Sequence, residues 1–173
     1  MRHTSRCITV RFLEFWKSGE GPAMAEVTAS DLAKHIIDSF ASKGESITNL
    51  KLQKLLYYTQ AWHLALHGRV FFNDRIEAWV HGPVVPSVFQ EYRSFKWTSL
   101  KIVGGYSVNS GVVHHTSKVL EQYGRFDAYQ LERLTHSEHP WKNARTGIEP
   151  DVASHREIEP KVMLDYYRSR LNG

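Results

Sequence analysis

The chain has 173 residues, 42% of them hydrophobic and 23% charged, which suits one globular domain with a sizeable core and excludes a largely disordered or fibrous protein. No apolar run reaches the roughly 20 residues that a membrane helix needs, so we expect no membrane span and no membrane partner. The net charge is +4, but residues 1–23 carry +2 of it (four basic minus two acidic residues), and the nearly balanced remainder lacks the basic stripe typical of nucleic-acid-binding proteins.

Residues 1–23 differ in character from the rest of the chain. Arg11 and Glu14 interrupt their apolar stretch, so the segment lacks the continuous hydrophobic region of a signal peptide. We expect a single domain at 24–173 and a disordered or non-native extension at 1–23, with an amphipathic docking segment as the alternative. The single cysteine, Cys7, has no intrachain partner, which predicts a reducing, cytoplasmic environment.

Two helical patterns open the domain. Thr28 caps a predicted amphipathic helix that ends at Gly44. A second helix is predicted to begin after Thr48 and to end at His67, before Gly68; apolar residues cover most of its circumference, which indicates the central core helix. Its remaining polar strip is expected to face solvent or a partner, and it consists of Asn49, Gln53, Gln60, His63 and His67.

The next segments mix strand, turn and loop signals. Aromatic and β-branched residues over 70–81 predict short strands, the better one from Ile76 to Val80, before Gly82-Pro83 breaks the pattern. The spacing of apolar residues from Val85 to Tyr92 predicts a third helix. Residues 96–113 contain three glycines and are predicted to form a hairpin or a mobile loop.

Three further helices are predicted in the C-terminal part. The first begins at Thr116 or Ser117, the second begins at Asp127 with a capping-box-like pattern, and the last has Pro160 in its first turn. Pro140 is expected to stop the second of these helices. Together the elements predict a mainly α (α+β) fold: a compact bundle of about five to six helices around a central helix, with a small β element.

Two histidines on the central helix raise the question of a metal site. His63 and His67 lie one helical turn apart, as zinc ligands on helices do. In the zinc-protease pattern the residue after the first histidine is the general-base glutamate, and here it is Leu64. We therefore interpret both as polar-face histidines and predict no metal or other cofactor. The alternative is a metal-dependent hydrolase that uses His63, His67 and His136.

Other catalytic patterns are incomplete. No serine lies in a Gly-x-Ser-x-Gly turn, and Gly104-Gly105 lacks the further glycine and lysine of a phosphate-binding loop. Glu77, Glu91 and Glu138 are interpreted as surface or capping groups, with acid–base catalysis by a carboxylate pair as the alternative. We predict that the protein is not an enzyme.

Two segments combine aromatic side chains with rigid turns. In the first, Ile76 to Pro86, a predicted strand runs into a Gly-Pro sequence. In the second, Leu134 to Trp141, a predicted helix end is followed by a polar turn and an aromatic residue. Aromatic residues and rigid turns serve cores and binding surfaces equally, so both interpretations stay open.

Together with the central helix, these segments carry a family resemblance. In order and spacing, Leu52 to Trp62, Glu77 to Pro86 and Leu134 to Trp141 resemble the motifs of the Panacea-domain family, which includes phage-associated GepA-like proteins and SocA-like antitoxins. The resemblance implies a bacterial or prophage protein of a toxin–antitoxin system that binds and neutralises a cognate protein toxin from a neighbouring gene. For SocA-like members it also implies a proteolytic adaptor role, in which the toxin is presented to the ClpXP protease.

The resemblance does not fix the contact residues, so we assign them as a hypothesis from the three motifs. The predicted partner-binding residues are Gln53, Tyr58, Gln60, Trp62, Trp79, His81, Gly82, Pro83, Val84, Pro86, His136 and Trp141. A DNA-binding regulator is the further alternative to an antitoxin, and the balanced charge of the domain disfavours it.

Overall fold

The computed structural model describes residues 27–171, so the extension predicted at 1–23 and the domain start predicted at 24 lie outside the described residues. Within that range the chain forms seven α-helices, one short 3-10 helix and a two-stranded sheet, which confirms the predicted fold class. In chain order the elements are α2 (Ala29–Ala41), α3 (Asn49–His67), β1 (Glu77–Trp79), β2 (Gly82–Val84), α4 (Pro86–Tyr92), the 3-10 helix η1 (Arg93–Phe95), α5 (Ser110–Tyr123), α6 (Ala128–Ser137), α7 (His139–Ala144) and α8 (Pro160–Leu171).

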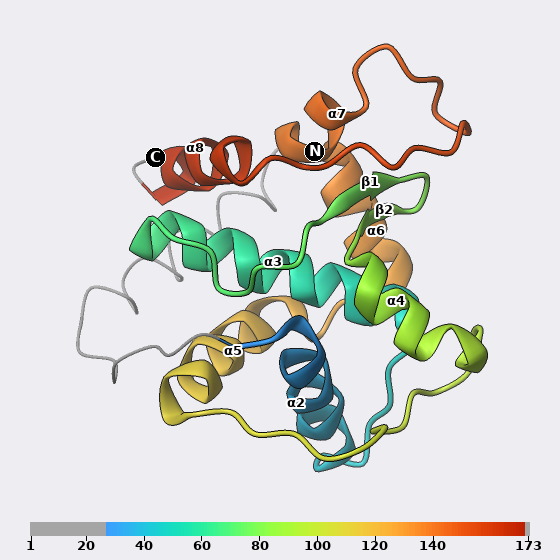
Figure 1. Cartoon of the computed structure of the whole chain (residues 1–173), viewed down its shortest axis with the longest axis vertical. Helices are drawn as coiled ribbons and strands as arrows, with labels where there is room; N and C mark the ends of the chain where they lie inside the picture. The colour runs from blue at the N-terminus through green and yellow to red at the C-terminus, as the bar shows by residue number, and fades with distance from the viewer. Residues whose placement is uncertain (1–26, 172–173) are drawn as a thin grey trace.

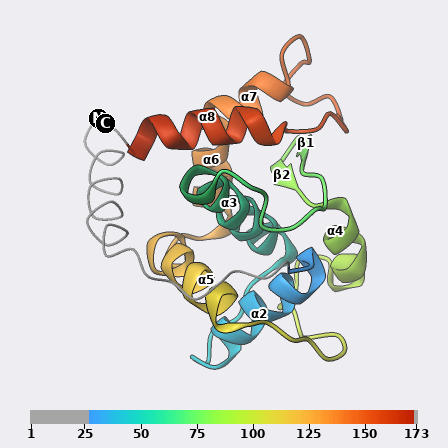
Figure 2. The ribbon, with the colours of Figure 1, turned by 60° about the vertical axis from the view of Figure 1, so that its left-hand side comes forward.

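Helix α3 runs through the middle of the molecule, with the other long helices around it (Figure 1). It contacts α2, α4, α5, α6, α8 and strand β2. Figure 2 shows α8 on one side of α3, and α2 and α5 on the other. The Thr48 side chain caps the helix by accepting from the Lys51 N–H, and Gly68 ends it with a φ of 70°. Both the boundaries and the central position of α3 were therefore readable from the sequence.

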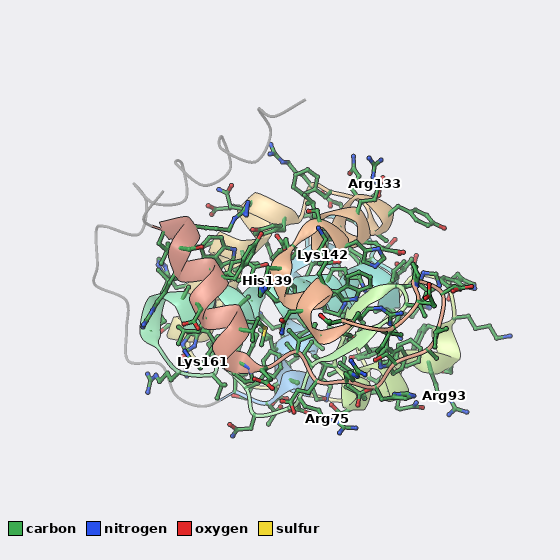
Figure 3. All side chains as sticks on the ribbon, turned by 90° about the horizontal axis from the view of Figure 1, so that it is seen from above. Arg75, Arg93, Arg133, His139, Lys142 and Lys161 are labelled. Carbon is green, nitrogen blue, oxygen red and sulfur yellow. The ribbon has the colours of Figure 1, made fainter. Side chains whose placement is uncertain are left out.

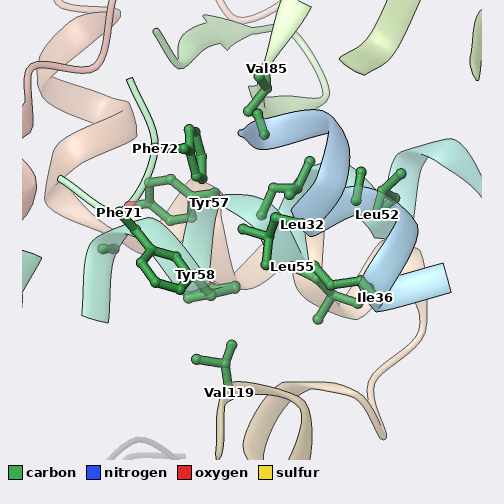
Figure 4. Close-up of a cluster of buried hydrophobic side chains, with 14 of the residues drawn as sticks. Leu32, Ile36, Leu52, Leu55, Tyr57, Tyr58, Phe71, Phe72, Val85 and Val119 are labelled. Atoms are coloured by element: carbon green, nitrogen blue, oxygen red, sulfur yellow. The ribbon is translucent and has the colours of Figure 1, made fainter. Parts of the chain in front are cut away.

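The core forms where apolar side chains of neighbouring elements pack against α3. Each of five such side chains is at most 3% exposed, and together they come from α2, α5 and the loop after α3: Leu32, Ile36, Phe71, Phe72 and Val119 (Figure 4). Full burial of an aliphatic or aromatic side chain of this size contributes about 1.5–3 kcal/mol. The almost continuous apolar surface of α3 is explained by its neighbours on every side.

The region predicted as a hairpin or mobile loop at 96–113 is a loop followed by the first turn of α5. Asn109 caps that helix by accepting from the Val112 N–H at 3.0 Å, well before the predicted start at Thr116 or Ser117. The predicted start is wrong because glycine and valine at positions 111–112 have low helix propensity. In the fold both residues are buried, and packing outweighs that preference.

The C-terminal helices follow their capping signals, with one exception. Asp127 and Gln130 form a complete capping box at the start of α6, and Pro160 begins α8, as predicted. Pro140 does not simply stop the preceding helix. It lies in the first turn of the short helix α7, where its missing N–H would have had no partner within the helix.

Candidate functional site

A tight β-hairpin packs against α3. Strands β1 and β2 pair antiparallel with Trp79 opposite Gly82, and residues 80–81 form the turn. The predicted strand break at Gly82-Pro83 is therefore wrong, because both residues pair within β2. Gly82 has a φ of 96°, and a Cβ there would lie 2.8 Å from Lys54 Cε, so glycine is required both by the backbone and by the space.

A buried lysine of α3 supports the hairpin from the inside. The Lys54 side chain is fully buried, and its Nζ donates to the Pro83 carbonyl at 3.1 Å. Burial lowers the pKa of this ammonium group to about 7, and the carboxylate of Glu132 acts in the opposite direction. Lys54 thus ties β2 to α3 through a backbone contact that an apolar side chain could not make.

The polar strip of α3 is buried except at its C-terminal end. Gln53 accepts from the Val85 N–H at 2.8 Å and donates to the Asn49 side chain at 2.9 Å. Gln60 accepts from both backbone N–H groups of residues 71–72. The prediction that this strip faces solvent holds only at the exposed His67; elsewhere buried backbone groups of the neighbouring loops need hydrogen-bond partners and these amides supply them.

Two further predicted contact residues, Tyr58 and Trp62, lie in an aromatic cluster of the core. Tyr58 stacks on Tyr123 with ring centroids 3.9 Å apart, and Trp62 Nε1 donates to the Tyr123 hydroxyl at 3.0 Å. Glu138, interpreted from the sequence as a surface or capping group, is buried beside this cluster and accepts from the Tyr167 hydroxyl at 2.7 Å. Burial raises the pKa of Glu138 to about 7. These side chains organise the core and present no surface to a partner.

The structure brings the two aromatic segments singled out in the sequence into direct contact. Trp141 Nε1 donates to the Trp79 carbonyl at 3.0 Å, and the His136 ring stacks on Trp141. The Trp79 indole donates to the Glu77 carboxylate at 2.7 Å and packs edge-to-face on Phe89. Trp141 therefore packs behind the hairpin turn and holds the backbone of Trp79, and His136 supports Trp141 by stacking on it.

The hairpin turn borders an open cleft of about 520 Å³, which we call the hairpin cleft. From the predicted set it is lined by Gln53, Trp79, His81 and Val84. The remaining lining comes from Val80 in the hairpin turn, from the first turn of α3, from α4 and η1, from residues 96–97 and from residues 153–155. Gly82 and Pro83 lie buried beneath the turn, and Pro86 starts α4. The volume is in the range of about 300–1,000 Å³ found for sites that enclose a small ligand or a few side chains.

The lining residues outside the predicted set include two cations and an exposed tryptophan. Arg93 and Lys96 supply positive charge, and Trp97 is 74% exposed at the rim. The Arg93 side chain extends outward at one edge of the molecule (Figure 3). The available signal was a tryptophan beside a lysine in a region without strong helix or strand pattern, since loop aromatics are often functional.

The histidines that raised a metal hypothesis pack with aromatic rings. His63 stacks on Phe71 and contacts the ring of His115 edge-on, and burial lowers the pKa of His63 to about 4. His136 instead stacks on Trp141. Within residues 27–171, no group of three or more His, Cys, Asp or Glu side chains is placed to hold a metal ion. The trio proposed for a hydrolase is thus not assembled in the described part of the chain.

Of the helices between residues 27 and 171, none combines the length and the hydropathy that a membrane crossing requires.

Comparison with known proteins gives one family. The family described as "Antitoxin SocA-like, Panacea domain" matches residues 52–142, which run from the first turn of α3 into α7 and include the whole hairpin. Antitoxin SocA of Caulobacter vibrioides (strain NA1000 / CB15N) is 30% identical over 159 residues, which cover 82% of this chain and 83% of the relative. No solved structure matches the chain significantly. The matched region and the extent of the identity agree, and the chain belongs to the SocA-like antitoxin family with a Panacea domain.

Proposed function

We propose that this protein neutralises a cognate protein toxin, encoded by a neighbouring gene, by binding it through the hairpin cleft. The observation that carries the proposal is the position of the cleft: an open, aromatic-lined cavity lies at the hairpin, and its lining from Gln53 to Trp97 falls within the region that matches the antitoxin family. Tryptophan and arginine are the residue types that most often dominate binding energy at protein interfaces. Trp79, Arg93 and Trp97 supply them here.

The predicted contact residues divide into two groups under this proposal. His81 and Val84 line the cleft next to Trp79 and are proposed to touch the toxin. Gln53 lines the cleft but is buried, and its amide holds the backbone of Val85; the other buried side chains hold the hairpin and the core. Substitution of a buried member is therefore expected to reduce binding by unfolding the site, whereas substitution at the rim acts on contact alone.

Trp97→Ala tests the proposal at the rim, because a 74% exposed side chain contributes little to the core. We expect the variant to fold normally and to bind the product of the neighbouring open reading frame at least about tenfold more weakly, since a large aromatic contact is lost. Binding is measured by isothermal titration calorimetry, and rescue of growth is measured during co-expression. Tyr129→Ala is the matched control, because Tyr129 is 73% exposed on α6 and outside the cleft.

An unchanged affinity of Trp97→Ala would contradict binding of the toxin in the hairpin cleft. A neighbouring gene product that is harmless, or that this protein does not bind, would contradict the antitoxin proposal itself.

Presentation of the toxin to ClpXP is the adaptor form of the same proposal, and it follows from the family resemblance of the three sequence motifs, which implies this role for SocA-like members. If it holds, purified ClpXP should degrade the toxin only when this protein is present, and Trp97→Ala should slow that degradation in proportion to the lost affinity. Equal degradation with and without the protein would leave direct inhibition as the mode of neutralisation.

A further inference from the structure

The charged side chains that line the hairpin cleft are all basic. Its lining contains the cations Arg93 and Lys96 and no aspartate or glutamate. Among the described residues, no salt bridge includes either cation, and the Arg93 guanidinium donates to the neutral side chain of Gln90 at 3.0 Å. The cleft therefore presents positive charge that the fold itself does not neutralise.

Two acidic side chains contact residues of the cleft lining, and neither pairs with Arg93 or Lys96. Glu77 is buried, and its carboxylate accepts from Trp79 and pairs with Arg75 and His155. The carboxylate of Glu132, on α6, lies 3.2 Å from His81 Nδ1. Neither is therefore placed to compensate the charge that faces the cleft.

The apolar part of the cleft lies beside these cations. Trp79 and Phe89 form an edge-to-face pair with ring centroids 4.9 Å apart, and Leu50 and Val84 add aliphatic surface. Trp97 stands largely exposed at the rim. An aromatic or large aliphatic side chain of a partner would find an apolar cavity here, while its flanking residues would meet the cations.

The backbone at Lys96 supports a functional origin of this arrangement. Lys96 has a φ of 50° with a ψ of −114°, and no other non-glycine residue among those described has a positive φ. A lysine rarely adopts this conformation, which glycine would adopt freely. Strained backbone of this kind concentrates at binding sites, where it holds side chains in useful positions. Here it holds a cation and the exposed Trp97 at the rim of one cleft.

We propose that the hairpin cleft binds a short acidic segment of the toxin that carries one aromatic or large aliphatic side chain. The inference rests on the proposed function and specifies the chemistry of the partner. Charge argues against the two other candidate occupants, because residues 1–23 of this chain carry a net charge of +2 and a second copy of the chain carries +4. Both would bring positive charge to a positive cleft.

The test reverses the charge of the cleft while keeping its aromatic surface. The double variant Arg93→Glu/Lys96→Glu is compared with Arg133→Glu/Lys43→Glu, which makes the same change in net charge at exposed positions outside the cleft. Figure 3 shows the Arg93 and Arg133 side chains at well separated edges of the molecule. Thermal melting of both double variants is measured first, to check that each is folded.

We expect the cleft variant to bind the neighbouring gene product at least about tenfold more weakly and the control to bind within about twofold of the wild type. The affinity of the wild type should fall with added salt, and that salt dependence should diminish in the cleft variant. On an array of short overlapping peptides from the toxin and from residues 1–26 of this chain, the strongest binders should be acidic and contain an aromatic or large aliphatic residue.

The outcomes distinguish two claims: that the toxin binds in the cleft, and that the bound segment is acidic. If Trp97→Ala weakens binding but the charge reversal does not, the cleft binds the toxin and the acidic segment is wrong. If a basic peptide from residues 1–26 binds best, the occupant is the protein's own N-terminal segment and the inference is overturned. If neither Trp97→Ala nor the charge reversal changes the affinity, the toxin does not bind in the cleft and that part of the proposed function is wrong as well.

Discussion

Replacement of Gln60 by leucine is expected to lower the free energy of unfolding by about 3–5 kcal/mol. The amide oxygen accepts from the Phe71 N–H at 2.7 Å and from the Phe72 N–H at 3.2 Å, and the amide nitrogen donates to the Phe72 carbonyl at 2.9 Å. All three backbone groups lie in the buried segment after α3. Leucine fills a similar volume but leaves them without partners, and each unsatisfied buried group costs about 1–3 kcal/mol.

Urea unfolding followed by circular dichroism measures this loss. Gln122→Leu is the control, because Gln122 is a half-buried glutamine on α5 and its replacement should change the unfolding free energy by less than about 0.5 kcal/mol. A loss below about 1 kcal/mol for Gln60→Leu would show that the loop finds other partners, and that Gln60 does not anchor it.

The parts of the fold that could be predicted are those governed by local signals. Thr48 and Gly68 mark the ends of α3 because capping and the left-handed glycine act within one turn of the helix. The capping box at Asp127 is equally local. The dense apolar surface of α3 predicts that it is central, since only a helix with neighbours on every side can bury that surface.

The features that escaped prediction depend on contacts between distant segments. A glutamine such as Gln53 or Gln60 has the same local pattern whether it meets water or a buried loop, and only the fold decides between them. The start of α5 depends on packing of residues 111–112 against the core, which outweighs their low helix propensity.

The hairpin cleft is also non-local. Its lining comes from α3, from the hairpin, from residues 89–97 and from residues 153–155, which no sequence motif joins. The family motifs pointed to Trp79 and His81 but not to Arg93 or Trp97, because a motif marks one stretch of chain and the cleft combines several.

The unfolding free energy should also depend on pH through His115. This imidazole is buried, and burial, together with the nearby rings of His63 and His67, lowers its pKa to about 3. Its Nε2 lies 2.9 Å from the Thr59 carbonyl, which acts in the opposite direction. In the unfolded chain the pKa of histidine is about 6.5, so between pH 6.5 and pH 3 the unfolded state binds the additional proton. Stability from this residue is therefore complete above pH 6.5 and is lost as the pH falls.

The expected loss through His115 between pH 7 and pH 4 is about 3 kcal/mol, since each pH unit within the window changes the free energy by about 1.4 kcal/mol. His115→Gln removes the titrating group and keeps an amide that can donate to the Thr59 carbonyl. Urea unfolding at both pH values should show that this variant loses about 3 kcal/mol less than the wild type. His114→Gln, at the exposed neighbouring position on α5, should lose as much as the wild type.

Other buried groups do not obscure this comparison. His63 has a lowered pKa and adds to the acid sensitivity, whereas Glu138 has a raised pKa and opposes it, because its folded form takes up a proton as the pH falls from about 7. Glu138 remains in the wild type and in both variants, so its contribution cancels when the variants are compared, whereas His63 touches His115 and keeps part of the acid sensitivity in every variant. If His115→Gln and His114→Gln showed the same pH dependence, His115 would have to be accessible to protons in the folded state, and the tight packing around α3 at this position would be wrong.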